Sequence, residues 1–237
     1  MRLAILEAMN TTRRERRAGA LVTRLADGEQ RFVAAEAVAA DPLAEALDAA
    51  LRSGKSGLVE RAGESWFLTI LVPPVRLAII GAVHISQALA PIARIAGLDP
   101  TIIDPRAAFA TPERFPDTPV IAQWPDEALA ASPLDRFTAI CVLTHDPKID
   151  DRALVRALES DCFYIGALGS RKTHAKRIER MRAEGFGEKA LARIHAPIGL
   201  DIGATSPAEI AVSIVGEIIA ALGRKPPRAE RGEGAAS

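Results

Sequence analysis

One stretch, residues 77–104, constrains the fold of this chain more than any other. It begins with the continuous apolar run Leu77–Ile80, which ends at Gly81, and continues with apolar residues at helical spacing until Gly97. A second apolar run follows and closes at Asp104. A buried strand, a glycine turn, a helix and a second strand make up the βαβ unit of a parallel sheet. The stretch therefore predicts an α/β fold with a Rossmann-like, doubly wound parallel sheet. Asp104 stands where such folds place a ribose-binding carboxylate.

The dinucleotide-binding fingerprint in this stretch is incomplete. Gly81 takes the first glycine position, but Val83 and Ser86 stand where the second and third glycines are expected. The second glycine lets the backbone approach a pyrophosphate, and a β-branched residue narrows that approach. The N-terminus of the following helix still offers free N–H groups to an anion. Packing alone is an equally consistent interpretation of such a degenerate motif.

The chain is predicted to divide into three parts. Residues 1–72 predict a small α+β domain with a hairpin at Asp27-Gly28, a helix from Asp41-Pro42 to Gly54, and two strands on either side of Gly63-Glu64. Pro73-Pro74 leads into a second domain, residues 73–223, where strands and helices alternate as in a parallel sheet covered on both faces. The tail, residues 224–237, is rich in proline, glycine and charge and is expected to be disordered.

Local patterns predict further elements of the second domain. The segment 194–204 is apolar, glycine-rich and too short between breaks for a regular element, so we expect an ordered functional loop. A helix that starts at the capping box Ser206–Glu209 should end at Gly223 and present an apolar stripe to the core. The other predictions are strands at 120–121, 138–143 and 162–165, helices at 126–131 and 151–159, and a charged helix from Ser170 to Gly185.

Composition narrows the classes of partner. Lys and Arg balance Asp and Glu, so no global field favours nucleic acid or an anionic membrane. Cys141 and Cys162 lie in apolar runs, as buried thiols of a reducing cytoplasm do, and supply neither a disulfide framework nor a metal-ligand pair. The sequence shows no signal peptide and no apolar run of membrane-spanning length. We therefore expect a cytoplasmic protein.

All four histidines, His84, His145, His174 and His195, follow a predicted strand or lie in a loop. Ligands of an open parallel sheet bind beyond the carboxyl ends of the strands, where the strand order reverses, so we expect His84 and His145 to be neighbours there. A single histidine is more often a satisfied loop residue than a functional group, and only their convergence argues for a site. No His-x-x-x-His or Cys-x-x-Cys spacing occurs, so no metal site is predicted.

Two further groups could contact a ligand. Asp104 with Arg106 suits a ribose hydroxyl or an added phosphate, while the alternative is a turn stabilised by an Asp-Pro step. Residues 166–172 combine backbone donors, a hydroxyl and two cations at a helix start, which suits a phosphate or a pterin-type heterocycle. The alternative there is a capped helix with a solvated basic face.

Several joined segments resemble the xanthine dehydrogenase accessory proteins of the XdhC type, which are related to the carbon monoxide dehydrogenase accessory proteins. The resemblance covers about residues 73–222 and rests on Gly81–His84, Ile103–Arg106, Leu143–Lys148, Tyr164–His174 and Pro197–Ala204. It implies a Rossmann-like factor that binds molybdenum cofactor (molybdopterin), assists its sulfuration alongside a cysteine desulfurase, and delivers it to a molybdenum hydroxylase such as xanthine dehydrogenase. Such a protein is a chaperone without turnover chemistry of its own, and we expect it to be a homodimer. The expected cofactor-binding residues are Gly81, His84, Asp104, Arg106, His145, Gly166, Gly169, Ser170, Arg171, His174 and Asp201.

The chain departs from that family in two places. The family usually has glycine where this chain has Val83, and its N-terminal domain commonly carries a Gly-Gly-Cys segment, whereas residues 1–72 contain no cysteine. A shortened paralogue, or one that only docks and protects the cofactor, would fit these departures. Two other classes of function stay open: an NAD(P)-dependent oxidoreductase, and a non-catalytic dimerisation module that uses the final apolar helix.

Overall fold

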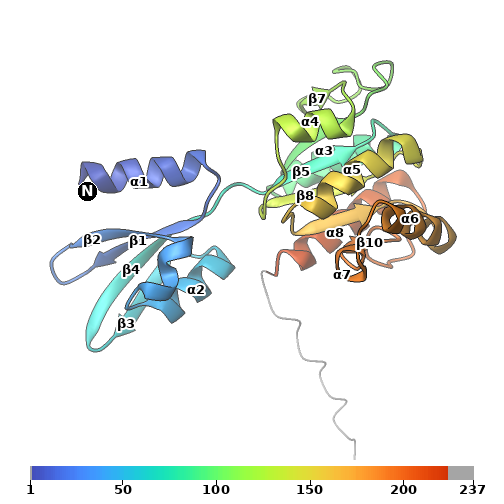
Figure 1. The fold of residues 1–237 in the computed structure, drawn as a ribbon. Coiled ribbons are helices and arrows are strands. Elements are labelled where there is room, and N and C mark those ends of the chain that lie inside the picture. Colours follow the sequence, from blue (N-terminus) through green and yellow to red (C-terminus); the bar gives the residue numbers. More distant parts are fainter. Residues whose placement is uncertain (1, 224–237) are drawn as a thin grey trace, which may run out of the picture. The chain divides into compact units, whose positions relative to one another are not determined.

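The computed structural model describes residues 2–223 (Figure 1). Contacts divide them into two compact units, one made of the described residues up to Pro73 and the other running from Pro74 to Leu222. Each unit has its own sheet and its own core. The tail expected at 224–237 lies outside the described residues.

The N-terminal unit is a four-stranded antiparallel sheet in the order β2-β1-β4-β3. Leu47 on α2 packs against Val22 and Leu68 of the sheet to form its core. The helix begins at Ala44, two residues after the expected Pro42, because the Asp41 carboxylate accepts the N–H of Leu43 and residues 42–43 form a turn. The elements are α1 (Leu3–Arg14), β1 (Gly19–Arg24), β2 (Gln30–Ala34), the 3-10 helix η1 (Ala35–Ala40), α2 (Ala44–Ser53), β3 (Gly57–Arg61) and β4 (Glu64–Leu71).

The larger unit is a six-stranded parallel sheet, which confirms the predicted Rossmann-like fold. Its order is β10-β9-β8-β5-β6-β7, so the chain builds outward from β5 in one direction and then returns to build in the other from β8. The order therefore reverses between β5 and β8, and the loops after these two strands border the crevice where ligands of such sheets bind. The strands are β5 (Arg76–Ile80), β6 (Asp99–Ile103), β7 (Val120–Ile121), β8 (Thr138–Val142), β9 (Tyr164–Ala167) and β10 (Ile194–His195).

Helices cover both faces of this sheet, as the uninterrupted apolar strands require (Figure 1). Helices α3 and α8 pack on one face, and α4 and α5 pack on the other. The capping box at the start of α8 is confirmed, since Ser206 accepts the N–H of Glu209 and the Glu209 carboxylate accepts the N–H of Ser206. The helices are α3 (His84–Ile95), α4 (Pro125–Ala131), α5 (Pro147–Glu159), α6 (Arg171–Ala183), α7 (Glu188–Leu191) and α8 (Pro207–Ala221).

Three expectations for this unit were wrong in detail. The strand expected at 162–165 runs from Tyr164 to Ala167, in register with β8. Helix α5 starts at Pro147 rather than at 151, because the Asp146 side chain accepts the N–H of Lys148 and caps it. The segment 194–204 is not all loop, since Ile194–His195 pairs with β9 as the edge strand β10. Each difference depends on pairing or capping that local apolar patterns do not reveal.

Candidate functional site

The loops after β5 and β8 touch at the point where the strand order reverses. Gly81 adopts a φ of +112°, a conformation that side chains rarely allow. A Cβ at Gly81 would lie 2.7 Å from Cγ2 and 3.3 Å from the backbone N of Thr144 in the β8 loop. Gly81 therefore permits the close approach of the two loops that form this part of the crevice.

The start of α3 accommodates both departures from the glycine fingerprint. Val83 is the N-cap residue and has an extended backbone (φ −104°, ψ 173°) that valine adopts without strain. Ser86 is buried, and its hydroxyl donates to the carbonyl of Gly81 over 2.6 Å. His84 is the first residue of α3 and is exposed. The backbone at Val83 and Ser86 therefore does not require glycine.

Asp104 and Arg106 form a closed pair at the end of β6. The Asp104 side chain is fully buried, and its two oxygens accept four hydrogen bonds: one from the N–H of Ala82 (2.7 Å), one from the N–H of Arg106 (2.9 Å), and two from the Arg106 guanidinium (2.9 and 2.7 Å). Burial alone would raise the pKa of Asp104, but these hydrogen bonds outweigh it and hold the pKa below its usual value. A carboxylate has about four lone-pair sites, so none is left to accept from a ribose hydroxyl in this arrangement.

The β8 loop brings a histidine and a buried acid to the same edge. His145 is exposed and has a positive φ of +64°. Asp150 on α5 is buried, and Oδ1 accepts from the Thr144 hydroxyl over 2.5 Å and from the Thr144 N–H over 3.3 Å. Burial raises the pKa of the Asp150 carboxyl, and the hydrogen bonds from Thr144 offset that only in part. The loop is thus hydrogen-bonded to a carboxyl group on α5 that is poorly solvated in its charged form.

The β9 loop starts α6 as the sequence indicated. Ser170 is the N-cap and its hydroxyl accepts the N–H of Thr173. Gly169 has a φ of +136°, and a Cβ there would lie 3.1 Å from Thr173. Gly166, by contrast, lies inside β9, where a Cβ would come within 2.5 Å of Ile198, so its position is explained by packing. Arg171 is exposed at the first position of α6.

A cavity of about 300 Å³ lies between the β8 loop and α6. Four of its wall residues are cationic and one, Asp150, is a carboxylic acid. Arg180 is ion-paired with Asp151, with nitrogen–oxygen distances of 2.5 and 2.9 Å. Of the predicted site residues, His145 is the one in this wall. The wall consists of His145, Pro147, Asp150, Lys172, Thr173, Lys176, Arg177 and Arg180.

Arg177 is the functional candidate that the sequence reasoning missed. Its side chain is 2% exposed, and Nη2 donates to the carbonyl of Leu168 over 2.8 Å. Its Nε and Nη1 are buried without a hydrogen-bond partner among residues 2–223. Burial lowers the pKa of the guanidinium. Arg177 stands four residues before the buried Met181, and this i, i+4 spacing on a charged helix was the available signal.

The other predicted residues lie at different places around the sheet. His174 on α6 is half-buried, and burial together with Arg177 lowers the pKa of its imidazole. His195 on β10 has Nδ1 3.0 Å from Oε1 of Glu217 on α8 and does not belong to the cavity wall. Asp201 is exposed in the loop before α8 and is also outside that wall. Of the predicted residues, the structure therefore places His145 in the cavity wall and leaves His174, His195 and Asp201 outside it.

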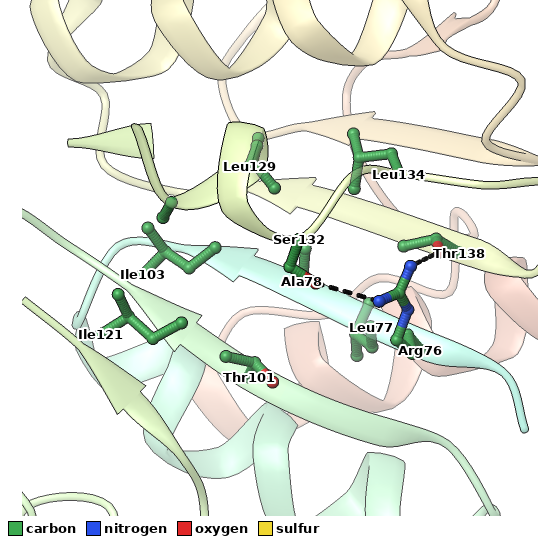
Figure 2. A pocket seen from close by; sticks show the side chains of 11 residues that line it. Arg76, Leu77, Ala78, Thr101, Ile103, Ile121, Leu129, Ser132, Leu134 and Thr138 are labelled. Atoms are coloured by element: carbon green, nitrogen blue, oxygen red, sulfur yellow. Dashed lines mark hydrogen bonds between the residues drawn. The ribbon is translucent and has the colours of Figure 1, made fainter. Parts of the chain in front are cut away.

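A second, smaller cavity of about 100 Å³ lies between the sheet and α4 (Figure 2). Figure 2 shows Ile103, Ile121 and Leu129 in its wall, with Arg76 at one side. The Arg76 guanidinium donates to the hydroxyls of Ser132 (3.0 Å) and Thr138 (3.4 Å). The wall includes the first residues of β5 and β8 rather than the loops that follow them, so this cavity is not part of the crevice.

Two features are absent from the described part of the chain. Within residues 2–223, no group of three or more His, Cys, Asp and Glu side chains is arranged to hold a metal ion. In the same range, no helix has both the length and the hydropathy to cross a membrane.

The chain is similar in sequence to a known family and to several known proteins. Residues 77–218 match a family model described as the XdhC Rossmann domain. The chain is 32% identical over 154 residues to a Bacillus subtilis protein named as a probable xanthine dehydrogenase component, and this alignment covers 65% of this chain and 44% of the relative. It is 32% identical over 146 residues to the molybdenum cofactor insertion chaperone PaoD of Escherichia coli, which covers 62% of this chain and 40% of the relative. The chain thus spans less than half the length of the curated relatives that it matches.

A solved structure shares the fold. It is a protein described as a xanthine dehydrogenase from Bacillus halodurans, which superposes with a TM-score of 0.64 at 22% identity. The match covers 95% of this chain and 66% of that one. At this identity the likeness shows a shared fold and says nothing about function.

Proposed function

The chain belongs to the XdhC family, and on that premise we propose that it binds molybdenum cofactor and assists its maturation and insertion into a xanthine dehydrogenase-type molybdenum hydroxylase. The name of the relative PaoD supports a role in cofactor insertion, and that of the Bacillus subtilis relative supports a xanthine dehydrogenase client. The chain acts in this proposal as a carrier that holds the cofactor and releases it to the client.

The observation that carries the proposal is the basic cavity between α6 and the β8 loop, one of the two loops that border the reversal point of the Rossmann sheet. Its volume of about 300 Å³ is at the lower end of pockets that hold small molecules, which run from about 300 to 1,000 Å³. Lys172, Lys176 and Arg177 line it beside the N-terminus of α6, whose dipole also favours an anion. Molybdenum cofactor is anionic, and the orphaned buried nitrogens of Arg177 fit such a ligand. When bound, the cofactor supplies the metal chemistry that the client uses.

The closed Asp104–Arg106 pair counts against the NAD(P) alternative. All four acceptor sites of the carboxylate are occupied within the chain, so a nucleotide ribose would have to break the pair before it could bind there. In this proposal Gly81 and Asp104 position the loops at this edge of the sheet, through the close approach to Thr144 and the hydrogen bond from Ala82, rather than contacting a ligand. His84, Arg171, His174 and Asp201 stay predictions as cofactor contacts.

The sulfur for cofactor maturation would have to come from a partner cysteine desulfurase. The chain has two cysteines, Cys141 and Cys162, and both are buried. Burial raises the pKa of each thiol, which lowers its reactivity. A sulfur relay through a cysteine of this chain is therefore not part of the proposal.

Self-association is a second part of the proposal. Most of the apolar stripe of α8 is buried against α3, but Val212 and Ile219 are 52% and 41% exposed. Sedimentation of the purified chain should show a dimer at micromolar concentration, and the Val212→Ser variant should shift it toward a monomer. A wild-type monomer would remove this part alone.

A loading assay tests the binding proposal. Cofactor released from a denatured molybdenum enzyme is offered anaerobically to the purified chain, which is then gel-filtered and assayed for oxidised pterin by fluorescence. The wild type should retain pterin, and Lys176→Gln should retain several-fold less. Arg182→Gln is the matched control, because Arg182 lies on the same helix but pairs with Glu188 outside the cavity. No retention by the wild type, or equal losses in the two variants, would contradict the proposal.

A further inference from the structure

We propose that the cavity between the β8 loop and α6 binds the phosphate group of a phosphate monoester, with Arg177 as its innermost ligand. The inference rests on the proposed function in placing the ligand in the same cavity, and it names which part of a ligand this cavity recognises. It adds Arg177, a residue that neither the sequence motifs nor the names of the relatives assign, and it decides for a phosphate monoester where the motif at the start of α6 left a phosphate and a heterocycle open.

The buried side chain of Arg177 has hydrogen-bond donors without partners. A guanidinium has five N–H donors, and those of Arg177 on Nε and Nη1 are buried without a partner within residues 2–223. Buried donors in native proteins are nearly always satisfied, and a charged group that is not carries a large penalty. Arg177 also belongs to the cavity wall. An acceptor that reaches these nitrogens from the cavity would supply the missing partners.

The wall of the cavity carries mostly positive charge. Lys172 and Lys176 are exposed on the side of α6 that lines the cavity, one turn apart, and His145 faces them from the β8 loop. Asp150 is the single acid in the wall, and its electrostatic interaction with Arg177 is favourable. The described residues give no Asp150–Arg177 ion pair within 4.0 Å, so the acid does not satisfy the arginine. The cavity therefore keeps an excess of positive charge that suits a dianion.

The free donors of Arg177 and the size of the cavity bear on which anion fits. The free donors on Nε and Nη1 lie on different edges of the guanidinium, so they offer separate hydrogen bonds, which the several oxygens of a phosphate group can accept together with water. The cavity of about 300 Å³ has room for about ten water molecules of about 30 Å³ each, several times more than a phosphate group needs. Two residues of the wall, Lys172 and Lys176, are exposed to solvent. An ester group can extend there, so a phosphate monoester fits better than free phosphate.

The alternative is that Arg177 serves only to hold the β9 loop through its bond to Leu168. That role needs one nitrogen and explains neither of the other two. The two interpretations differ in whether the purified protein binds phosphate at all.

Isothermal titration of the full chain with inorganic phosphate, methyl phosphate and dimethyl phosphate tests the inference. We expect methyl phosphate to bind at one site at least as tightly as inorganic phosphate, and the dimethyl ester, a monoanion, to bind at least tenfold more weakly. Arg177→Met should weaken methyl phosphate binding by at least about tenfold, as loss of hydrogen bonds to a charged group predicts. Arg182→Met is the control and should bind like the wild type. Binding of inorganic phosphate with exclusion of methyl phosphate would overturn the ester assignment.

Two more variants keep the test decisive if Arg177→Met does not fold. Lys176→Gln removes an exposed cation from the wall and should weaken methyl phosphate binding about threefold or more. Asp150→Asn keeps an oxygen for both hydrogen bonds from Thr144 while removing the opposing charge, so it should tighten binding by a similar factor. No binding by the wild type, or no change in these two variants, would overturn the inference.

The result can be separated from the proposed function. If Arg177→Met loses phosphate binding and the wild type carries no pterin, the inference stands and the proposed function fails. If the wild type and Arg177→Met retain equal amounts of pterin, the inference fails and the proposed function stands.

Discussion

Asp104→Asn should destabilise the larger unit by about 3 kcal/mol at pH 7. The backbone N–H of Ala82 and Nη2 of Arg106 both donate to the same oxygen, Oδ2, and an asparagine amide nitrogen in that place would face two donors. Each hydrogen bond to a charged acceptor contributes about 1.5–3 kcal/mol. The loss is below the sum of two, because the Arg106 side chain is 35% exposed and can turn its guanidinium to water.

The assay is urea unfolding of the full chain in a Trp66→Phe background. The chain has two tryptophans, and this change leaves Trp124, which is partly buried against the core of the larger unit, as the sole tryptophan. With a slope of about 2 kcal/mol per molar urea, the midpoint should fall by about 1.5 M. Asp99→Asn is the matched control, since Asp99 is the exposed first residue of the same strand, and its effect should stay within about 0.5 kcal/mol.

The pH dependence gives an independent check. The pKa of Asp104 is lower in the folded protein than the 3.8 of its unfolded form, so its contribution is present above that value and is lost as the pH falls through the folded pKa. The stability difference between wild type and Asp104→Asn should therefore shrink below about pH 4. A loss under about 1 kcal/mol at pH 7, or one equal to that of Asp99→Asn, would refute the assignment of Asp104 as a structural acceptor.

Three further outcomes are expected. Gly81→Ala should lower the free energy of unfolding by more than about 2 kcal/mol in the same assay, because of the positive φ and the contact with Thr144, and an unchanged midpoint would contradict this. The pKa of Asp150 is higher in the folded protein than the 3.8 of its unfolded form. The wild type should therefore lose stability relative to Asp150→Asn as the pH rises from 3.8 to the folded pKa. Parallel stability curves of the two proteins from pH 3 to pH 8 would contradict this. A thiol reagent at pH 8 should label neither Cys141 nor Cys162 in the folded protein and both in denaturant, as mass spectrometry would show; rapid labelling of the native chain would disprove their burial.

The sequence was sufficient where a residue's role depends on local backbone. The apolar run up to Gly81, the caps at Ser170 and Ser206, and the left-handed Gly54 after α2 could all be predicted from short patterns. The doubly wound sheet followed from the alternation of such elements. The boundary at β10 failed because a distant partner decides it, since this strand pairs with β9. The start of α5 failed although its cap is local, because Asp146 and Pro147 lie before the apolar pattern that was used to place the helix.

The candidate site was less predictable, because its chemistry depends on contacts between distant residues. Asp104 matched the position of a ribose carboxylate, yet Arg106 and Ala82 occupy all its acceptor sites. Arg177 looks in the sequence like one cation of a solvated helix, and its burial and unused donors become visible only once α6 is packed against the β9 loop. Local patterns placed His145 at the edge of the sheet where the basic cavity lies, but they could not show that Arg177 is buried there.

The central claim, that this chain carries molybdenum cofactor, is tested most directly on protein purified from a host that makes the cofactor. The bound pterin is released, oxidised and quantified by fluorescence, and molybdenum is measured on the same sample. The account predicts pterin in near-stoichiometric amount, falling several-fold in Lys176→Gln and unchanged in Arg182→Gln. Protein that is free of pterin, and that also takes none up in the loading assay, would contradict it.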